Sequence, residues 1–160
     1  MLDGASRLDE IVEAAIKDEQ PALGITDHGN MYGVLPFYRA CKSQGIKPII
    51  GTEAYMAYDS RYERPKRGRG NVDDSGGDTD QGRKLYYHLT LLAENNNGYK
   101  NLIQIASRAF MEGFYYKPRI DWEVLNDHSD GVIATTGCLG GQVLQALLRD
   151  DEPEALERAG

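Results

Sequence analysis

Five side chains that can bind a metal ion or take part in acid–base chemistry lie in or directly after four short apolar runs. The runs span 22–30, 49–53, 86–89 and 133–138, and the side chains are Asp27, His28, Glu53, His88 and Cys138. Short apolar runs of this kind, bounded by glycine or proline, are typical of buried strands. Because α/β folds carry their functional residues at strand ends, the pattern indicates one shared site.

Histidine, carboxylate and thiolate groups that are presented together could hold zinc, manganese or iron, since each offers a neutral or deprotonated donor. A carboxylate such as Glu53 can also bridge two ions. Such a centre generates a nucleophile from water near neutral pH and stabilises both ends of a phosphoryl displacement. The residue types therefore favour metal-assisted hydrolysis of a phosphoester.

Each of these residues also has a structural interpretation that the sequence leaves open. Asp27 is equally suited to capping the next helix, and His28 to a hydrogen bond beside that cap. Glu53 could be an exposed acid on an edge strand. His88 could be a core histidine with satisfied nitrogens, and Cys138 a small buried apolar residue.

Apolar residues at helical spacing predict helices between the strands, and a turn is expected at 95–98. The predicted helices lie at 6–20, 33–44, 102–109, 121–125, 142–148 and from 153 onwards. Asp121 is expected to cap its helix. Strands that alternate with helices imply right-handed βαβ units and a parallel sheet or barrel.

The segment 59–84 lacks apolar periodicity and is rich in glycine, aspartate and basic residues. A stretch of this composition predicts a long exposed loop inserted within the domain. Its basic residues could contact phosphates, with Tyr62 available for stacking; they are Arg61, Arg64, Lys66, Arg67 and Arg69. Acidic residues follow directly, and we interpret the segment as a solvated loop that neutralises its own charge.

The composition is that of an ordinary globular domain, with 160 residues, 41% of them hydrophobic, and a net charge of −7. The acidic balance suits a cation-binding site better than a dedicated nucleic-acid binder. No apolar run approaches the roughly 18 residues that cross a membrane, so we expect a cytoplasmic protein without a membrane partner. Cys41 and Cys138 lie far apart, which suits a reducing compartment.

Four segments together closely resemble one family over nearly the whole chain. They are TDHGNMYG at 26–33, GIKPIIGTEAY at 45–55, HLTLLA at 88–93 and GFYYKPRID at 113–121. The family is the polymerase-and-histidinol-phosphatase (PHP) domain, in the branch found at the start of the bacterial DNA polymerase III alpha subunit. The second and fourth segments point to this replicative branch rather than to stand-alone phosphatases.

The resemblance implies an α/β fold, an incomplete distorted seven-stranded (β/α) TIM-like barrel with a metal centre at its strand ends. Family ligand positions match Asp3, His28, Glu53, His88 and Cys138, with Asp27 as a ligand or a neighbour of the ligands. Glu53 and His28 are the expected catalytic residues, and zinc or manganese the expected metal. Some members use this centre for 3′→5′ exonuclease proofreading, whereas in others the domain only supports the polymerase.

The resemblance also implies a longer parent chain, because family members begin with a further strand and continue into the polymerase domains. We therefore expect 1–160 to be a partial PHP domain of an alpha subunit that synthesises DNA from deoxynucleoside triphosphates. Primer-template DNA, the sliding clamp and other holoenzyme subunits are the expected partners, with magnesium at the distant polymerase site. The fragment alone is expected to be inactive. The alternatives are a non-catalytic scaffold of the polymerase and a stand-alone PHP phosphatase.

Overall fold

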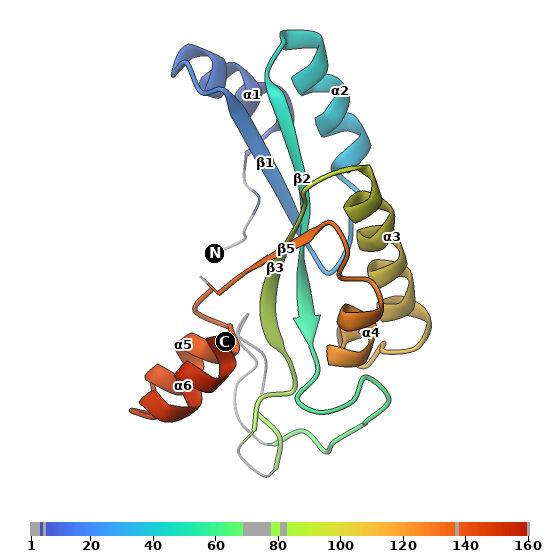
Figure 1. Cartoon of the computed structure of the whole chain (residues 1–160), viewed down its shortest axis with the longest axis vertical. Coiled ribbons are helices and arrows are strands. Elements are labelled where there is room, and N and C mark those ends of the chain that lie inside the picture. The colour runs from blue at the N-terminus through green and yellow to red at the C-terminus, as the bar shows by residue number, and fades with distance from the viewer. Residues whose placement is uncertain (1–3, 5, 69–77, 81–82, 137, 160) are drawn as a thin grey trace.

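The computed structural model describes residues 4, 6–68, 78–80, 83–136 and 138–159 (Figure 1). Helices and strands alternate along most of this part of the chain. In order, the elements are α1 (Leu8–Lys17), β1 (Ala22–His28), α2 (Val34–Gln44), β2 (Lys47–Met56), β3 (Tyr87–Ala93), α3 (Asn96–Met111), β4 (Arg119–Ile120), α4 (Trp122–Asp127), β5 (Val132–Thr135), α5 (Gln142–Leu147) and α6 (Glu152–Ala159). Each predicted helix is present, and the α/β fold class is confirmed. Among the described residues, no helix is long and apolar enough to span a membrane.

Helix α3 begins inside the segment that the sequence predicted as a turn. Asn95 is its N-cap, and its side-chain oxygen accepts the N–H groups of Asn97 at 2.9 Å and Gly98 at 3.0 Å. An asparagine in this role satisfies donors that the first helical turn would otherwise leave unpaired. The asparagine-rich stretch therefore starts the helix instead of forming a separate turn.

The five strands form one mixed sheet in the order β1-β2-β3-β5, with β4 paired to β2. β2 is parallel to β1 and to β4, whereas β3 is antiparallel to both β2 and β5. The expectation of a parallel sheet was therefore wrong for β3, which runs against the other four strands. The described residues between β2 and β3 contain no helix that could make a crossover, and a chain that returns without one pairs antiparallel.

The two faces of the sheet have different neighbours because successive strand residues point in opposite directions. Ala54 and Met56 of β2 belong to a buried core together with Leu102 and Ile105 of α3. A second buried cluster joins α1 and α2, and β1 packs against it. Figure 1 shows these two helices beside β1 and β2. The alternate residues of β2, among them Glu53, point to the face away from these helices.

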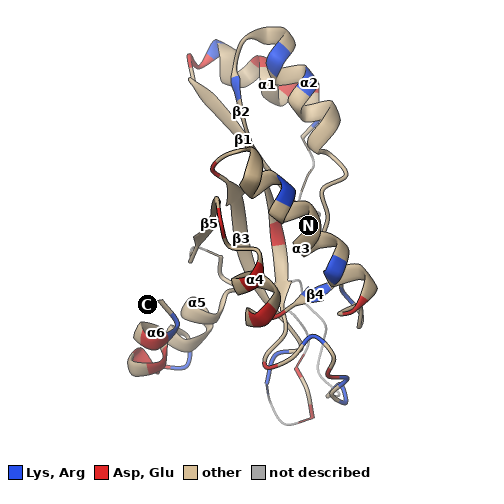
Figure 2. Ribbon diagram, turned by 45° about the vertical axis from the view of Figure 1, so that its right-hand side comes forward, with Lys and Arg blue, Asp and Glu red and all other residues tan. Residues whose placement is uncertain are grey.

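Part of the predicted exposed loop, at 69–77 and 81–82, lies outside the described residues. Figure 2 shows acidic and basic residues interspersed in the described part of this loop, and acidic residues gathered on α4 and α6. Exposure of the whole 59–84 segment thus stays a prediction, but two of its described residues, Arg61 and Thr79, are buried.

Arg61 is buried, with 1% of its surface exposed, although the segment was predicted to be solvated. Its guanidinium donates to the carboxylates of Glu112 at 2.6 Å, Asp121 at 2.8 Å and Glu123 at 3.0 Å. Asp121 also accepts the N–H of Val124, which confirms the predicted cap of α4. A buried cation is stable only when paired and hydrogen-bonded, and these carboxylates meet that condition while tying the loop to α3 and α4.

Candidate metal centre

Three of the predicted ligands come from three neighbouring strands and share one face of the sheet. His28 is the last residue of β1, and Glu53 is its direct partner on parallel β2. His88 is the second residue of β3 and pairs with Tyr55, two positions beyond Glu53 on the same face. His88 reaches this end of the sheet because β3 is reversed, so that its first residues meet the last residues of β1 and β2.

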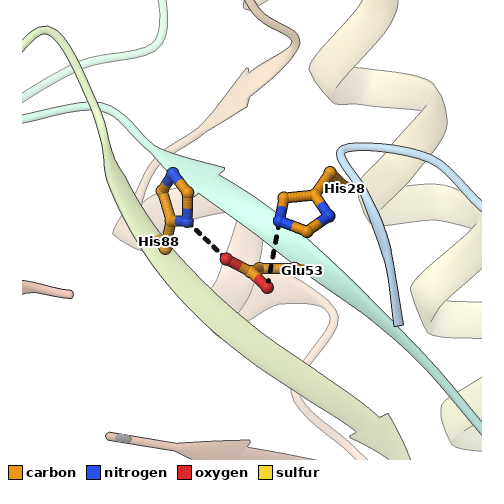
Figure 3. Close-up of side chains that lie close together, drawn as sticks. All are labelled: His28, Glu53 and His88. Carbon is orange, nitrogen blue, oxygen red and sulfur yellow. Dashed lines mark hydrogen bonds and ion pairs between the residues drawn. The ribbon is translucent and has the colours of Figure 1, made fainter. Parts of the chain in front are cut away.

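The carboxylate of Glu53 lies between the two imidazoles, as Figure 3 shows. Its Oε2 is 3.4 Å from Nε2 of His28, and its Oε1 is hydrogen-bonded to Nδ1 of His88. One ligand atom from each of the three residues lies within 4.8 Å of the other two. We refer to these residues as the His28–Glu53–His88 cluster.

Cys138 lies beside the cluster, in the glycine-rich turn that leads to α5. Its Sγ is 3.5 Å from Oε1 of Glu53 and 3.6 Å from Nδ1 of His88. The backbone of His88 donates to the carbonyl of Gly140 at 2.9 Å, which holds this turn against β3. A Cβ at Gly140 would come within 3.2 Å of the His88 ring, so the close approach favours glycine. Neither Cys41 nor Cys138 forms a disulfide within the part of the chain that the structure describes.

The electrostatics of the cluster favour a bound cation. The hydrogen bond with His88 lowers the pKa of Glu53, although burial acts in the opposite direction, so the carboxylate is ionised and can bind a cation. The side chains of His88 and Glu53 are 5% and 13% exposed, and that of His28 is 34% exposed. The cluster is therefore an ionised, half-buried site that opens to solvent beside His28.

The donor atoms of the cluster and of Cys138 fit a divalent metal ion. Two imidazoles, a carboxylate and a thiol form a donor set suited to zinc or a similar divalent ion. The His88 atom turned toward Glu53 and Cys138 is Nδ1, so each of these donors already faces the same space. The residues present therefore fit a divalent ion.

Of the other two predicted ligands, the structure describes only Asp27, and it lies away from the cluster. Asp27 precedes His28 on β1, so its side chain points to the opposite face, where Oδ2 accepts the N–H of Gly33 at 2.7 Å. Gly33 is the N-cap residue of α2, so Asp27 is hydrogen-bonded to the residue at the start of the helix that the sequence offered it for capping. Asp3 lies outside the described residues. Both stay predictions as ligands.

Tyr55 is a neighbour of the cluster that the sequence analysis did not single out. Its buried ring lies edge to face with that of His88, with centroids 5.2 Å apart. Gly29, at φ +66°, leaves room for it, since a Cβ there would lie 2.6 Å from the Tyr55 ring. The two-residue period of β2 places Tyr55 on the same face as Glu53, and this signal was present in the sequence.

The fold and the site define a class: an α/β protein with a histidine–glutamate–histidine cluster where three adjacent strands of a mixed sheet meet at one end. The family model described as "PHP domain" matches residues 1–160. The chain belongs to the PHP domain family.

The curated relatives are much longer than this chain. It is 48% identical to the DNA polymerase III subunit alpha of Thermus aquaticus over 94% of its own length and 12% of the relative's. It is 44% identical to that of Treponema pallidum over 99% of its length and 45% identical to that of Aquifex aeolicus over 88%, again covering 12% of each. The chain thus spans about an eighth of these relatives.

One solved structure is also similar, a protein described as a metal-dependent phosphoesterase from Bifidobacterium adolescentis. It matches with a TM-score of 0.39 and 18% identity, over 67% of this chain and 29% of its own. A likeness of this level bears on neither the fold nor the site argued above.

Proposed function

We propose that this chain is the PHP portion of a bacterial replicative DNA polymerase alpha subunit. The identity of 48% to the subunit from Thermus aquaticus over 94% of the chain supports this assignment. In this proposal the whole polypeptide synthesises DNA from deoxynucleoside triphosphates on a primer-template in the cytoplasm, with magnesium at a polymerase site elsewhere in the chain. The sliding clamp and other holoenzyme subunits are its partners.

For the PHP portion itself, the proposed activity is metal-dependent hydrolysis of a phosphodiester at a DNA 3′ end. The observation that carries it is the placement of the Glu53 carboxylate between His28 and His88, with the Cys138 thiol 3.5 Å away. These four residues would hold zinc or manganese. A bound divalent ion supplies Lewis-acid activation of water and neutralises charge on the phosphate.

The residues of the chain have distinct roles in this proposal. Glu53 uses both carboxylate oxygens, one toward each imidazole, and so positions the centre. His88 and Cys138 form its more buried side, while His28 is the most exposed member of the cluster and lies where DNA would enter. In the reaction, water adds to phosphorus and the bond to the 3′-oxygen of the preceding nucleotide breaks. That oxygen takes up a proton, and a 5′-mononucleotide is released.

The test compares Glu53→Gln with Glu94→Gln in the full-length polypeptide. Glu94 is an exposed acid directly after β3 and serves as the matched control. We expect Glu53→Gln to lower bound metal, measured by elemental analysis, by more than tenfold and to abolish nucleotide release from a mispaired primer. Primer extension should continue at its normal rate in both variants.

Two results would contradict the catalytic proposal. One is a folded wild-type protein that binds no metal at submicromolar concentration, and the other is nuclease activity unchanged by Glu53→Gln. Loss of folding and polymerase activity in Glu53→Gln, without a separate nuclease defect, would instead favour the scaffold alternative. A reading frame that ends soon after this region would favour the stand-alone phosphatase.

A further inference from the structure

The turn at 113–118, between α3 and β4, holds a tyrosine in a backbone conformation that side chains rarely adopt. Tyr116 has a φ of +62° and is 54% exposed. On either side of it, the N–H of Tyr115 donates to the carbonyl of Lys117 at 3.0 Å, which closes the turn. Strain of this kind persists where the surroundings impose it, and it is concentrated at binding and catalytic sites.

Lys117, the next residue, contacts Tyr55, which is a neighbour of the metal centre. Its Nζ lies over the buried ring of Tyr55, 5.4 Å from the centroid. The same ring lies edge to face with His88, 5.2 Å away. The ammonium group of Lys117 is therefore separated from the His28–Glu53–His88 cluster by one aromatic ring, which places a positive charge beside the proposed reaction site.

The exposed side of the turn carries a second cation. The guanidinium of Arg67 lies 5.8 Å from the centroid of the Tyr116 ring. The turn thus presents one solvent-facing aromatic ring, that of Tyr116, near two cationic side chains. They are Arg67, which contacts the ring, and Lys117, which contacts Tyr55 beside the cluster. Exposed aromatic rings stack on bases, and neighbouring cations pair with phosphates, which is how proteins bind single strands without reading their sequence.

We propose that the turn 113–118 is a binding subsite for single-stranded DNA that enters the metal centre. In it, a base stacks on Tyr116, and Lys117 contacts the phosphate that approaches the cluster. This inference rests on the proposed function, because it names how that site holds its substrate. The positive φ of Tyr116 then has a role: it leaves the ring exposed while the next residue, Lys117, contacts Tyr55.

The first experiment needs no metal and no turnover. A single-stranded oligonucleotide with a photoreactive 4-thiothymidine at its 3′ end is irradiated with the full-length polypeptide in chelator, and cross-linked peptides are identified by mass spectrometry. We expect a cross-link within 113–118 that Tyr116→Ala reduces at least fivefold. Tyr38→Ala is the matched control, since Tyr38 is 44% exposed on α2 and also has a nearby lysine.

The second experiment separates binding from folding and from chemistry. Tyr116→Gly relieves the backbone strain but removes the ring, so it should fold at least as well as wild type. Tyr116→Gly and Lys117→Gln should each raise KM for nucleotide release about tenfold, with kcat within twofold. Lys117→Arg keeps the positive charge, so its KM should stay close to that of the wild type. Bound metal should be unchanged in all three variants, because none of these residues is proposed as a ligand.

The outcomes distinguish this inference from the proposed function. Cross-links confined to other peptides, or an unchanged KM in Tyr116→Gly and Lys117→Gln, would overturn the subsite while leaving the nuclease intact. A wild-type protein with bound metal but no nuclease activity would overturn the proposed function. The cross-link in chelator would still decide whether the turn binds single-stranded DNA.

Discussion

His28 and Glu53 occupy directly paired positions at the ends of two parallel strands, with His28 Nε2 3.4 Å from Glu53 Oε2. The backbone pairing of β1 and β2 fixes this relationship, so it does not depend on a flexible loop. The neighbouring Asp27, one residue earlier, lies on the other face of the same strand and contacts α2. Two adjacent residues of one motif therefore have separate structural roles.

This separation predicts different effects for Asp27→Ala and His28→Ala. Asp27→Ala removes the acceptor of the Gly33 N–H and should destabilise the start of α2 by about 1 kcal/mol, measured by native-state hydrogen exchange, with metal content unchanged. His28→Ala should lower metal affinity at least tenfold with little change in exchange. If Asp27→Ala lost metal as His28→Ala does, Asp27 would be a ligand after all.

Arg61→Met should be among the most destabilising single substitutions in the loop after β2. The change leaves the buried carboxylate of Asp121 and its neighbours without their cation, for a loss of about 3–5 kcal/mol in the free energy of unfolding. Arg7→Met serves as the control, because the Arg7–Glu10 pair is exposed on α1 and should be nearly neutral. Urea unfolding measures both, and equal effects would mean that the Arg61 pairs are not stabilising.

The stability of the α3 end should depend on pH through Glu112. Hydrogen bonds from Arg108 and then Arg61 lower the pKa of Glu112 to about 2. A depressed carboxylate pKa stabilises the fold above the ordinary value of about 4.3, and this contribution is lost as pH falls toward 2. In Glu112→Gln, the free energy of unfolding should therefore fall less steeply between pH 5 and pH 2 than in the wild type. An unchanged slope would show that other carboxylates control acid unfolding.

Gly29→Ala and Gly45→Ala form a matched pair that tests the packing under Tyr55. Both glycines have positive φ, +66° and +78°, so both substitutions incur a similar backbone cost. At Gly29 the new Cβ would also lie 2.6 Å from the Tyr55 ring, whereas nothing lies within 4 Å at Gly45.

Gly29→Ala should therefore cost more stability than Gly45→Ala, by about 1–3 kcal/mol, and should also weaken metal binding by displacing Tyr55 from His88. Thermal unfolding and metal titration of the two variants check these expectations. Equal destabilisation in both, with metal affinity retained, would mean that Tyr55 moves freely and does not support the cluster.

The sequence by itself determined the elements and much of the candidate site. Apolar periodicity and capping residues predicted the helices and the strands β1, β2, β3 and β5, because these signals act over a few residues. It also identified His28, Glu53, His88 and Cys138, since few other residues in the apolar runs can bind a metal. The turn predicted at 95–98 was wrong only because Asn95 caps a helix there.

Only the tertiary structure decided how these residues meet. The direction of β3 depends on its pairing with β2, a long-range interaction that no local pattern encodes, and its reversal brings His88 to Glu53. The burial of Arg61 depends likewise on carboxylates 51 to 62 residues away in the chain. The sequence thus supplied the ligand types, while strand direction and strand face decided which of them, His28 rather than Asp27, lies at the cluster.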